Sequence, residues 1–170
     1  MYQIVMVRHA IALHRDDAFA RGISDEQRPL TDTGRKKMHR IARGLALLVG
    51  QCGVIATSPL LRARQTAELV AECFAGVPVV ACPALAPGAA PAQLLEWLRR
   101  HGTQTPAMVV GHEPDLGRWA AWALTGRDHE FMAFKKGGAC VLEFTPRLDA
   151  GQARLSWLCT PKQLIAIGNG

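Results

Sequence analysis

The chain has 170 residues, of which 49% are hydrophobic and 20% are charged. This size and composition predict a single globular domain over 1–170, with enough apolar surface to bury a core. No apolar stretch approaches the roughly 20 residues of a membrane helix, and Arg8 and His9 interrupt the N-terminal apolar run before it resembles a signal peptide. We therefore expect a cytoplasmic protein that makes no membrane contact.

The formal net charge is +6, which would suit nucleic acid or another polyanion. The basic residues are scattered, however, and the densest run, over 35–40, falls on an amphipathic helical pattern whose polar face would be solvated. We therefore expect an anionic substrate but no nucleic-acid partner. The five cysteines are odd in number and lack CxxC spacing, so neither a disulfide framework nor a metal site is predicted.

The first predicted elements alternate between strand and helix patterns. A β-type apolar run predicts a strand over 2–7, and the polar, charge-rich segment 14–29 is interpreted as a surface loop. Thr31 begins a capping segment for a helix, which carries apolar residues at helical spacing and ends at Gly50.

The next predicted strand covers 53–57. Ser58 behind it is a good helix N-cap, and Pro59 a good first helical residue. A weaker strand is predicted over 77–82, followed by a loop over 83–91 that is rich in proline, alanine and glycine.

The second half continues the alternation. A helix is predicted from Pro91, a buried strand over 107–110 and another helix over 115–124. Segments 139–145 and 153–159 have strand character and are joined by a turn, which predicts an antiparallel hairpin at one edge. The whole pattern predicts an α/β layer architecture.

Three of the predicted strands end close to histidine or arginine. Arg8 and His9 follow the first strand, Arg62 lies in the first turn of the helix after the second, and His112 follows the strand over 107–110. Ligands bind at the carboxyl ends of strands in open α/β sheets. We therefore expect these four side chains to meet, and two imidazoles with two guanidiniums would suit a phosphoryl group.

The chemistry of these residue types assigns each a role. A neutral imidazole can attack phosphorus and carry the phosphoryl group covalently. Arginine grips phosphate oxygens with parallel donors, and its charge keeps a neighbouring histidine neutral. We predict His9 as the nucleophile between Arg8 and Arg62, with His112 donating to a phosphoryl oxygen or sharing its developing charge. Arg28 could also hold the substrate at the pocket mouth, although a loop-bracing role explains it equally well.

Four segments resemble, in order, the motifs of the histidine phosphatase superfamily, which holds the phosphoglycerate mutases and many phosphatases. They are Val7-Arg8-His9-Ala10, Arg28-Pro29-Leu30-Thr31-Asp32-Thr33-Gly34, Thr57-Ser58-Pro59-Leu60-Leu61-Arg62-Ala63-Arg64-Gln65-Thr66 and Val110-Gly111-His112-Glu113-Pro114. The short length, the Arg-Pro-Leu-Thr segment and the Gly-His-Glu-Pro motif are similar to its SixA-type phosphohistidine phosphatases. The resemblance extends to about Pro161.

The resemblance carries expectations of its own. It implies a phosphoglycerate mutase-like fold, which has a central, mostly parallel sheet flanked by helices, with His9 as the phosphorylated nucleophile. It also implies that Arg8, Arg62 and His112 form the pocket around the phosphoryl group. Finally, it implies a mechanism without a metal or another cofactor.

One departure from the larger family members concerns the general acid. Those members place a Glu or Asp on the loop after the third strand, whereas no carboxylate occurs here between Glu72 and Glu96. Acid catalysis is worth about 10²–10⁴-fold, and an alkoxide leaving group needs it more than imidazole does. The sequence therefore favours a labile phosphoryl donor, unless the proton comes from Glu113, Asp16, Asp17 or Asp25. A simpler role for Glu113 is to begin the following helix.

The leading hypothesis is a monomeric cytoplasmic phosphatase that removes phosphate from phosphohistidine on a partner protein, through phospho-His9. One alternative is a phosphatase for a small substrate with a good leaving group, such as a phosphoanhydride or acyl phosphate. Another is a non-catalytic phosphate-binding module. A shallow, open pocket would favour a protein substrate. His14 and Arg15 could line its entrance, although a plain surface role is favoured for both.

Overall fold

A six-stranded sheet forms the centre of the computed structural model, which describes residues 1–101 and 106–170. The strands are β1 (Tyr2–Arg8), β2 (Val54–Thr57), β3 (Val79–Ala81), β4 (Ala107–Gly111), β5 (Ala139–Phe144) and β6 (Ala153–Cys159). Their order is β3-β2-β4-β1-β5-β6; the first four are parallel, and β5 and β6 are antiparallel. The predicted α/β fold, with a mostly parallel sheet and an antiparallel edge hairpin, is confirmed.

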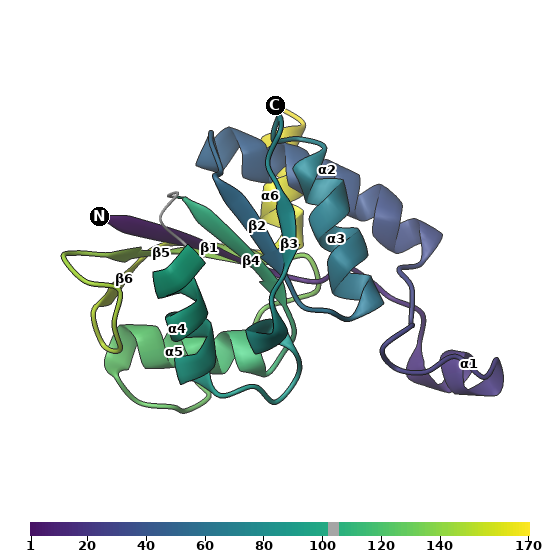
Figure 1. Ribbon diagram of the computed structural model, residues 1–170. Helices are drawn as coiled ribbons and strands as arrows, with labels where there is room; N and C mark the ends of the chain where they lie inside the picture. The colour runs from purple at the N-terminus through teal and green to yellow at the C-terminus, as the bar shows by residue number, and fades with distance from the viewer. Residues whose placement is uncertain (102–105) are drawn as a thin grey trace.

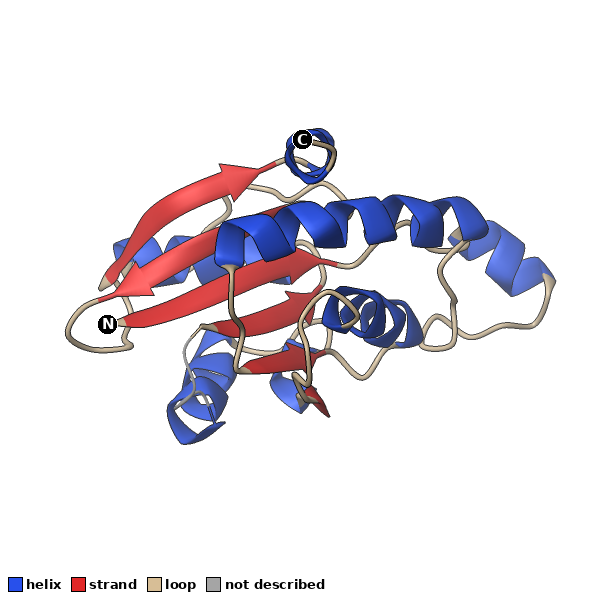
Figure 2. Ribbon diagram, turned by 90° about the horizontal axis from the view of Figure 1, so that it is seen from above, coloured by secondary structure: helices blue, strands red, loops and turns tan. Residues whose placement is uncertain are grey.

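Three helices cover one face of the sheet (Figure 2). They are α2 (Asp32–Val49), α3 (Leu61–Ala71) and α6 (Pro161–Gly168). Val5 and Val7 of β1 belong to this core, together with Met38 and Ile41 of α2 and Leu164 of α6. Successive side chains of a strand point to opposite faces, so alternate positions of β1 supply two separate cores.

The other face is covered by the short η1 (Pro83–Leu85), α4 (Pro91–His101) and α5 (Asp115–Thr125), as Figure 1 shows. Ile4 and Met6 of β1 pack in this second core with Leu94, Leu98 and Trp119. In the described ranges, no helix is both long enough and apolar enough to cross a membrane.

Segment 14–29 is not purely a loop, because it contains the short helix α1 (Arg15–Ala20). The His14 ring caps it by accepting the backbone N–H of Asp16, and Ala18 is its one buried residue. Figure 1 shows α1 standing away from the sheet. A helix this short, with so few buried positions, leaves no apolar periodicity in the sequence.

Helix α6 was not predicted, although its N-terminus carries a local signal. Thr160 and Gln163 form a capping box, and Pro161 occupies the first turn. Leu164 is fully buried, and its backbone packs against Gly44 of α2 so closely that a β-carbon there would overlap the Leu164 carbonyl oxygen. The glycine in α2 therefore sets how closely these two helices approach.

The predicted start of α3 was wrong. The helix begins at Leu61, with Leu60 as its N-cap residue, and not at Pro59 behind a Ser58 cap. The Ser58 Oγ atom instead accepts the backbone N–H of Leu60 and contacts a side chain from another strand end. The turn between β2 and α3 therefore delivers Ser58 to the interior of the site.

Candidate active site

The ends of β1, β2 and β4 bring His9, His112, Arg8 and Arg62 together. β1 and β4 are neighbours, with Arg8 in register with Gly111. The ring centroids of His9 and His112 lie 5.1 Å apart. All four side chains line one cavity of about 300 Å³, and Arg28 joins them there.

The His9 ring is buried and held in one tautomer. Its Nδ1 atom lies 2.7 Å from the Ala10 carbonyl oxygen; because a carbonyl can only accept, Nδ1 carries the proton. Burial lowers the pKa of His9 to about 4; the Ala10 contact opposes this, while Arg62 and Arg8 add to it. His9 is therefore neutral at neutral pH, with a lone pair on Nε2.

His112 is oriented by Ser58. Its Nε2 atom lies 2.7 Å from Ser58 Oγ, which itself accepts the Leu60 N–H at 3.3 Å. The pKa of His112 is lowered to about 3, mainly by burial and in addition by His9 and Arg62. A neutral His112 accepts the Ser58 hydroxyl at Nε2 and carries its proton on Nδ1. That buried Nδ1 has no partner within the described residues, so it offers a donor to a ligand.

Backbone carbonyl oxygens anchor Arg8 and Arg62 through their Nη1 atoms, and each arginine keeps one buried N–H donor without a partner among the described residues. Arg62 donates from Nη1 to the Asp25 carbonyl at 2.7 Å, and Arg8 donates from Nη1 to the Phe134 carbonyl at 2.6 Å. The Nε atoms of Arg8 and Arg62 are buried without a partner in the described part of the chain. Burial lowers the pKa of both, opposed by Glu113 at Arg8 and by Asp25 at Arg62. Arginine nevertheless stays charged.

Arg28 both lines the cavity and braces the loop. Its Nε atom donates to Asp25 Oδ1 at 2.8 Å, and its Nη1 atom to the Leu13 carbonyl at 2.6 Å. Asp25 also accepts from Arg62 through Oδ2 at 3.1 Å. Burial alone would raise the pKa of Asp25, but Arg28 and Arg62 outweigh it and leave the pKa lowered. Asp25 is thus a charged brace that positions two cationic side chains.

Of the four carboxylates considered as proton donors, Asp25 and Glu113 line the cavity, whereas Asp16 and Asp17 lie on α1. Glu113 precedes α5, and its Oε1 atom accepts the Phe134 N–H at 3.0 Å. Burial raises the pKa of Glu113, while the Phe134 N–H and Arg8 oppose the rise. Glu113 therefore fixes the segment that in turn holds the Arg8 guanidinium.

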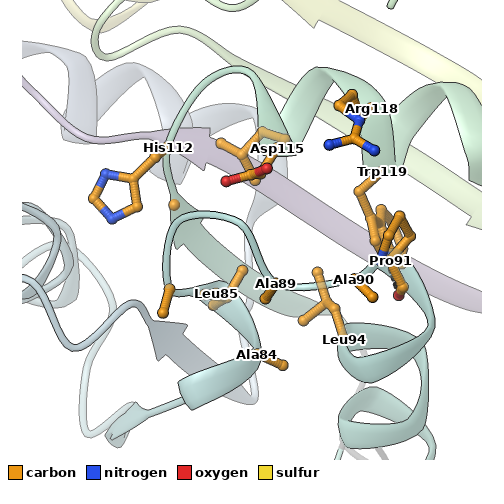
Figure 3. A pocket seen from close by; sticks show the side chains of 13 residues that line it. Ala84, Leu85, Ala89, Ala90, Pro91, Leu94, His112, Asp115, Arg118 and Trp119 are labelled. Carbon is orange, nitrogen blue, oxygen red and sulfur yellow. Dashed lines mark hydrogen bonds between the residues drawn. The ribbon is translucent and has the colours of Figure 1, made fainter. Parts of the chain in front are cut away.

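The loop after β3 presents apolar side chains next to His112. Figure 3 shows Leu85, Ala89 and Ala90 from this loop facing Leu94 and Trp119 across a small pocket, with His112 at one end. The loop is tied down by the Gly88 N–H, which donates to Asp115 at 2.8 Å. Pro87 of the same loop reaches the active-site cavity. The loop itself therefore brings proline, leucine and alanine to this side of the site, and the carboxylate beside it is Asp115 of α5, which holds the loop backbone.

Lys136 lines the cavity but was missed by the sequence analysis. Arg8 donates its N–H to the Gly138 carbonyl, and Gly137 donates its N–H to the Arg8 carbonyl, both at 3.0 Å. Lys136 is exposed at the cavity edge, and its partial desolvation there lowers its pKa, as do Arg8, Arg28 and Arg62. Gly137-Gly138 signals a turn, but no local pattern places that turn beside residue 8.

The positive charge at the site comes from arginine and lysine. In residues 1–101 and 106–170, no three His, Cys, Asp or Glu side chains gather as a metal-binding group. The arrangement offers one neutral nucleophile, one N–H donor on His112 and several fixed cations. These are the parts that phosphoryl transfer requires, namely positioning and charge stabilisation.

Comparisons with known proteins agree with this chemistry. The model of the histidine phosphatase superfamily (branch 1) matches residues 4–87. An uncharacterized protein of Picosynechococcus sp. is 37% identical over 167 residues, covering 96% of this chain and 99% of the relative. The protein histidine phosphatase SixA, solved with tungstate, has a TM-score of 0.79 at 24% identity, covering 95% of this chain and 99% of SixA.

A fold match at lower identity extends the range of substrates among similar structures. Phosphoserine phosphatase from Entamoeba histolytica, solved with 3-phosphoglyceric acid, has a TM-score of 0.68 at 16% identity. The match covers 96% of this chain and 100% of that one. The same fold therefore serves phosphatases with different names and substrates.

Proposed function

This chain belongs to the histidine phosphatase superfamily, and we propose that its phosphatase activity is directed at protein phosphohistidine, through a phosphoryl group carried on His9. One observation supports the substrate above the others. The loop after β3 brings no carboxylate to the site: Pro87 lines the active-site cavity, and the other apolar side chains of the loop line a small pocket that meets the cavity at His112. Of the two carboxylates that line the cavity, Asp25 is paired with Arg28 and Arg62, and Glu113 accepts the Phe134 N–H. An alkyl ester would therefore find no proton donor on this loop, whereas a phosphorylated imidazole can leave without one.

In the first step of the proposal, His9 Nε2 attacks phosphorus in line with the departing imidazole. The bond from His9 Nε2 to phosphorus forms as the bond from phosphorus to the substrate imidazole breaks. The electron pair of the breaking bond goes to the substrate ring nitrogen. A substrate ring protonated on its other nitrogen leaves as neutral imidazole. Arg8, Arg62 and the Nδ1–H of His112 face the three phosphoryl oxygens and stabilise their charge.

In the second step, water attacks the phosphorus on His9 and the P–Nε2 bond breaks. Inorganic phosphate forms, and a water proton passes to phosphate or solvent. Throughout both steps, the proton of His9 stays on Nδ1, which donates it in a hydrogen bond to the Ala10 carbonyl oxygen. His9 therefore returns to the same neutral tautomer without a proton transfer from the protein.

The shape of the site supports a protein substrate. His14 and Arg15 line the outer cavity, with side chains 71% and 77% exposed. The rim is therefore open where a protein would approach, while the phosphoryl-binding groups lie below it. An exposed histidine on a folded partner could reach His9 across such a rim.

A second candidate is a small phosphoanhydride or acyl phosphate. Arg28 and Lys136 line the cavity in addition to Arg8 and Arg62. These extra cations could hold a second anionic group of a small substrate, and a good leaving group again needs no acid. Turnover of the two substrate types separates the candidates.

The test compares kcat/KM for a phosphohistidine protein, acetyl phosphate, a phosphoserine peptide and an alkyl phosphate. We expect the phosphohistidine protein to exceed both esters by about 10²-fold or more, the range that acid catalysis would otherwise supply. His9→Ala should abolish turnover, and it should also abolish the alkali-stable phosphoryl group that the enzyme carries on His9 during turnover. His14→Ala, which removes a histidine at the rim, is the matched control and should keep both. Equal turnover of alkyl esters would contradict the substrate, and an active His9→Ala variant would contradict the nucleophile.

A further inference from the structure

A second cavity, of about 650 Å³, adjoins the active site and is lined by positive charge. We name it the basic groove. Its charged lining residues are Arg8, Lys37, Lys135, Lys136 and Lys162. Arg8 and Lys136 also line the active-site cavity, so the two cavities adjoin at these side chains.

The basic groove is assembled from four separate parts of the chain. Lys37 comes from α2, Lys162 from the first turn of α6, and Lys135 and Lys136 from the turn before β5. Backbone hydrogen bonds between Arg8 and the glycines after Lys136 hold that turn at the end of β1. Gly137 has a φ of +81°, and a β-carbon there would lie 2.7 Å from Ile41 of α2. The lysines are thus held against α2 by a turn that requires glycine.

The lysines of the basic groove have no carboxylate to neutralise them. None of the ion pairs within the described residues involves a lysine. Lys135, Lys136 and Lys162 are exposed, and no aspartate or glutamate of the described chain lines the groove. Gathering like charges costs electrostatic free energy in the free protein, and an anionic partner would relieve that cost.

The type of cation indicates the type of anion. A lysine ammonium is a hydrated point charge on a flexible stem, whereas arginine supplies the rigid fork that grips one phosphate. The groove has four lysines around a wide space, and its one arginine already faces the phosphoryl site. Dispersed, mobile cations of this kind attract a surface with several carboxylates and steer its approach.

We propose that the basic groove docks an acidic surface of the phosphorylated protein and so guides its phosphohistidine to His9. That the docked protein carries phosphohistidine rests on the proposed function. That the basic groove binds an acidic polypeptide does not depend on it. Glutamate or aspartate side chains beside the modified histidine would lie along Lys37, Lys135 and Lys162 while the phosphoryl group meets Arg8.

The test uses a double charge reversal that leaves the active-site cavity intact. Lys37→Glu and Lys162→Glu both lie in the groove, and neither residue lines the active-site cavity. The matched control is Lys36→Glu with Arg147→Glu, which makes the same charge change at exposed positions outside the groove. Lys36 is the immediate neighbour of Lys37 on α2, so this control separates position from net charge.

Two phosphohistidine peptides serve as substrates, one flanked by glutamates and one by serines. We expect the groove variant to lower kcat/KM for the glutamate peptide by about 10-fold or more, in the range of electrostatic steering. Turnover of the serine peptide should not change, and the control variant should resemble the wild type. The preference for glutamate should shrink between about 0.01 M and about 0.3 M ionic strength.

A binding measurement keeps docking separate from catalysis. Fluorescence anisotropy follows an unphosphorylated glutamate peptide on each variant at low salt. In one outcome, the wild type binds the glutamate peptide, the groove variant does not, and the wild type dephosphorylates neither phosphopeptide. This outcome would support docking and contradict the proposed function. Turnover of both peptides at equal rates in all variants would overturn docking alone. Absent peptide binding, or tighter binding of a single-stranded RNA of equal charge, would also overturn it.

Discussion

The Nε2 atom of His112 lies 2.7 Å from the Oγ atom of Ser58, across 54 positions of sequence. This contact joins the turn after β2 to the end of β4. It also decides which His112 nitrogen bears the proton, because Nε2 is the acceptor that the Ser58 hydroxyl hydrogen meets among the described residues, so the proton of the neutral ring lies on Nδ1. In the proposed mechanism, Ser58 is therefore a positioning residue for the His112 donor.

Ser58→Ala should lower kcat/KM by about 10-fold, the equivalent of one lost hydrogen bond of about 1.4 kcal/mol. The His112 ring would then lose the partner that fixes its tautomer. Nitrogen chemical shifts of the His112 ring, measured by NMR, should show a mixture of tautomers where the wild type shows one. Full activity together with an unchanged His112 spectrum would refute this role.

Both site histidines should remain neutral well below the ordinary histidine value of 6.5. NMR titration should give a pKa of about 4 for His9 and about 3 for His112, because burial disfavours both charged forms. The unfolded chain binds more protons than the folded one below pH 6.5, so the free energy of unfolding should fall as pH drops from 6.5 towards 4.

Urea unfolding at a series of pH values measures that loss of stability. His9→Asn should make the pH dependence shallower in the same window, because one of the two depressed pKa values is gone. A wild-type stability that is flat between pH 6.5 and pH 4 would contradict the burial argument.

Arg62→Lys should reduce kcat/KM by about 10²-fold or more, the cost of removing one transition-state donor. A lysine keeps the charge but loses the fork that both braces Asp25 and faces the cavity. The affinity for inorganic phosphate should fall in parallel, because one donor to the phosphate oxygens is lost. Arg28→Lys is the comparison, and we expect it mainly to raise KM. An Arg62→Lys variant with normal kcat would argue against a transition-state role.

Glu113→Gln should change phosphohistidine turnover by less than about 3-fold, under 1 kcal/mol. The amide oxygen can still accept the Phe134 N–H, so the brace around Arg8 is preserved. A general acid would behave differently, because its removal costs about 10²–10⁴-fold. A loss of that size on the phosphohistidine protein would identify Glu113 as the proton donor that the proposal omits.

Gly44→Ala should destabilise the fold by about 1–3 kcal/mol, because overpacking forces the backbones of α2 and α6 apart. The new β-carbon would overlap the Leu164 carbonyl oxygen. Thermal unfolding should show a drop of about 2–4 °C per kcal/mol for a chain of this size. Arg43→Ala, at the exposed neighbouring position, is the control and should stay within about 0.5 kcal/mol.

Much of the site could be predicted from sequence, because its main residues sit at the ends of strands. The strand patterns before Arg8, His9 and His112 are local, and in parallel strands the carboxyl ends share one edge. The side chains meet because β1 and β2 both lie beside β4, and this strand order is visible only in the structure. The strand patterns and the turn between them predicted the edge hairpin, and the family resemblance implied the mostly parallel sheet; the structure confirms both.

Other parts of the site could not be found in this way. Ser58 has a side chain that is typical of helix N-caps, but its hydrogen-bond partner in the structure is His112, at the end of β4. Lys136 reaches the cavity through backbone bonds between its turn and residue 8, more than a hundred positions away. The capping-box signal at Thr160 was available locally, but only packing against Gly44 explains why α6 lies on α2.

The sequence by itself determined the element types, the nucleophile candidate and the absence of a carboxylate between residues 72 and 96. These depend on residue identity and on neighbours a few positions apart, where periodicity, capping and side-chain chemistry act. Only the tertiary structure decided the His112 tautomer, the anchoring of Arg62 on Asp25 and the basic groove. Each of these is a contact between distant segments, and its geometry depends on how the sheet is ordered and how closely the helices pack upon it.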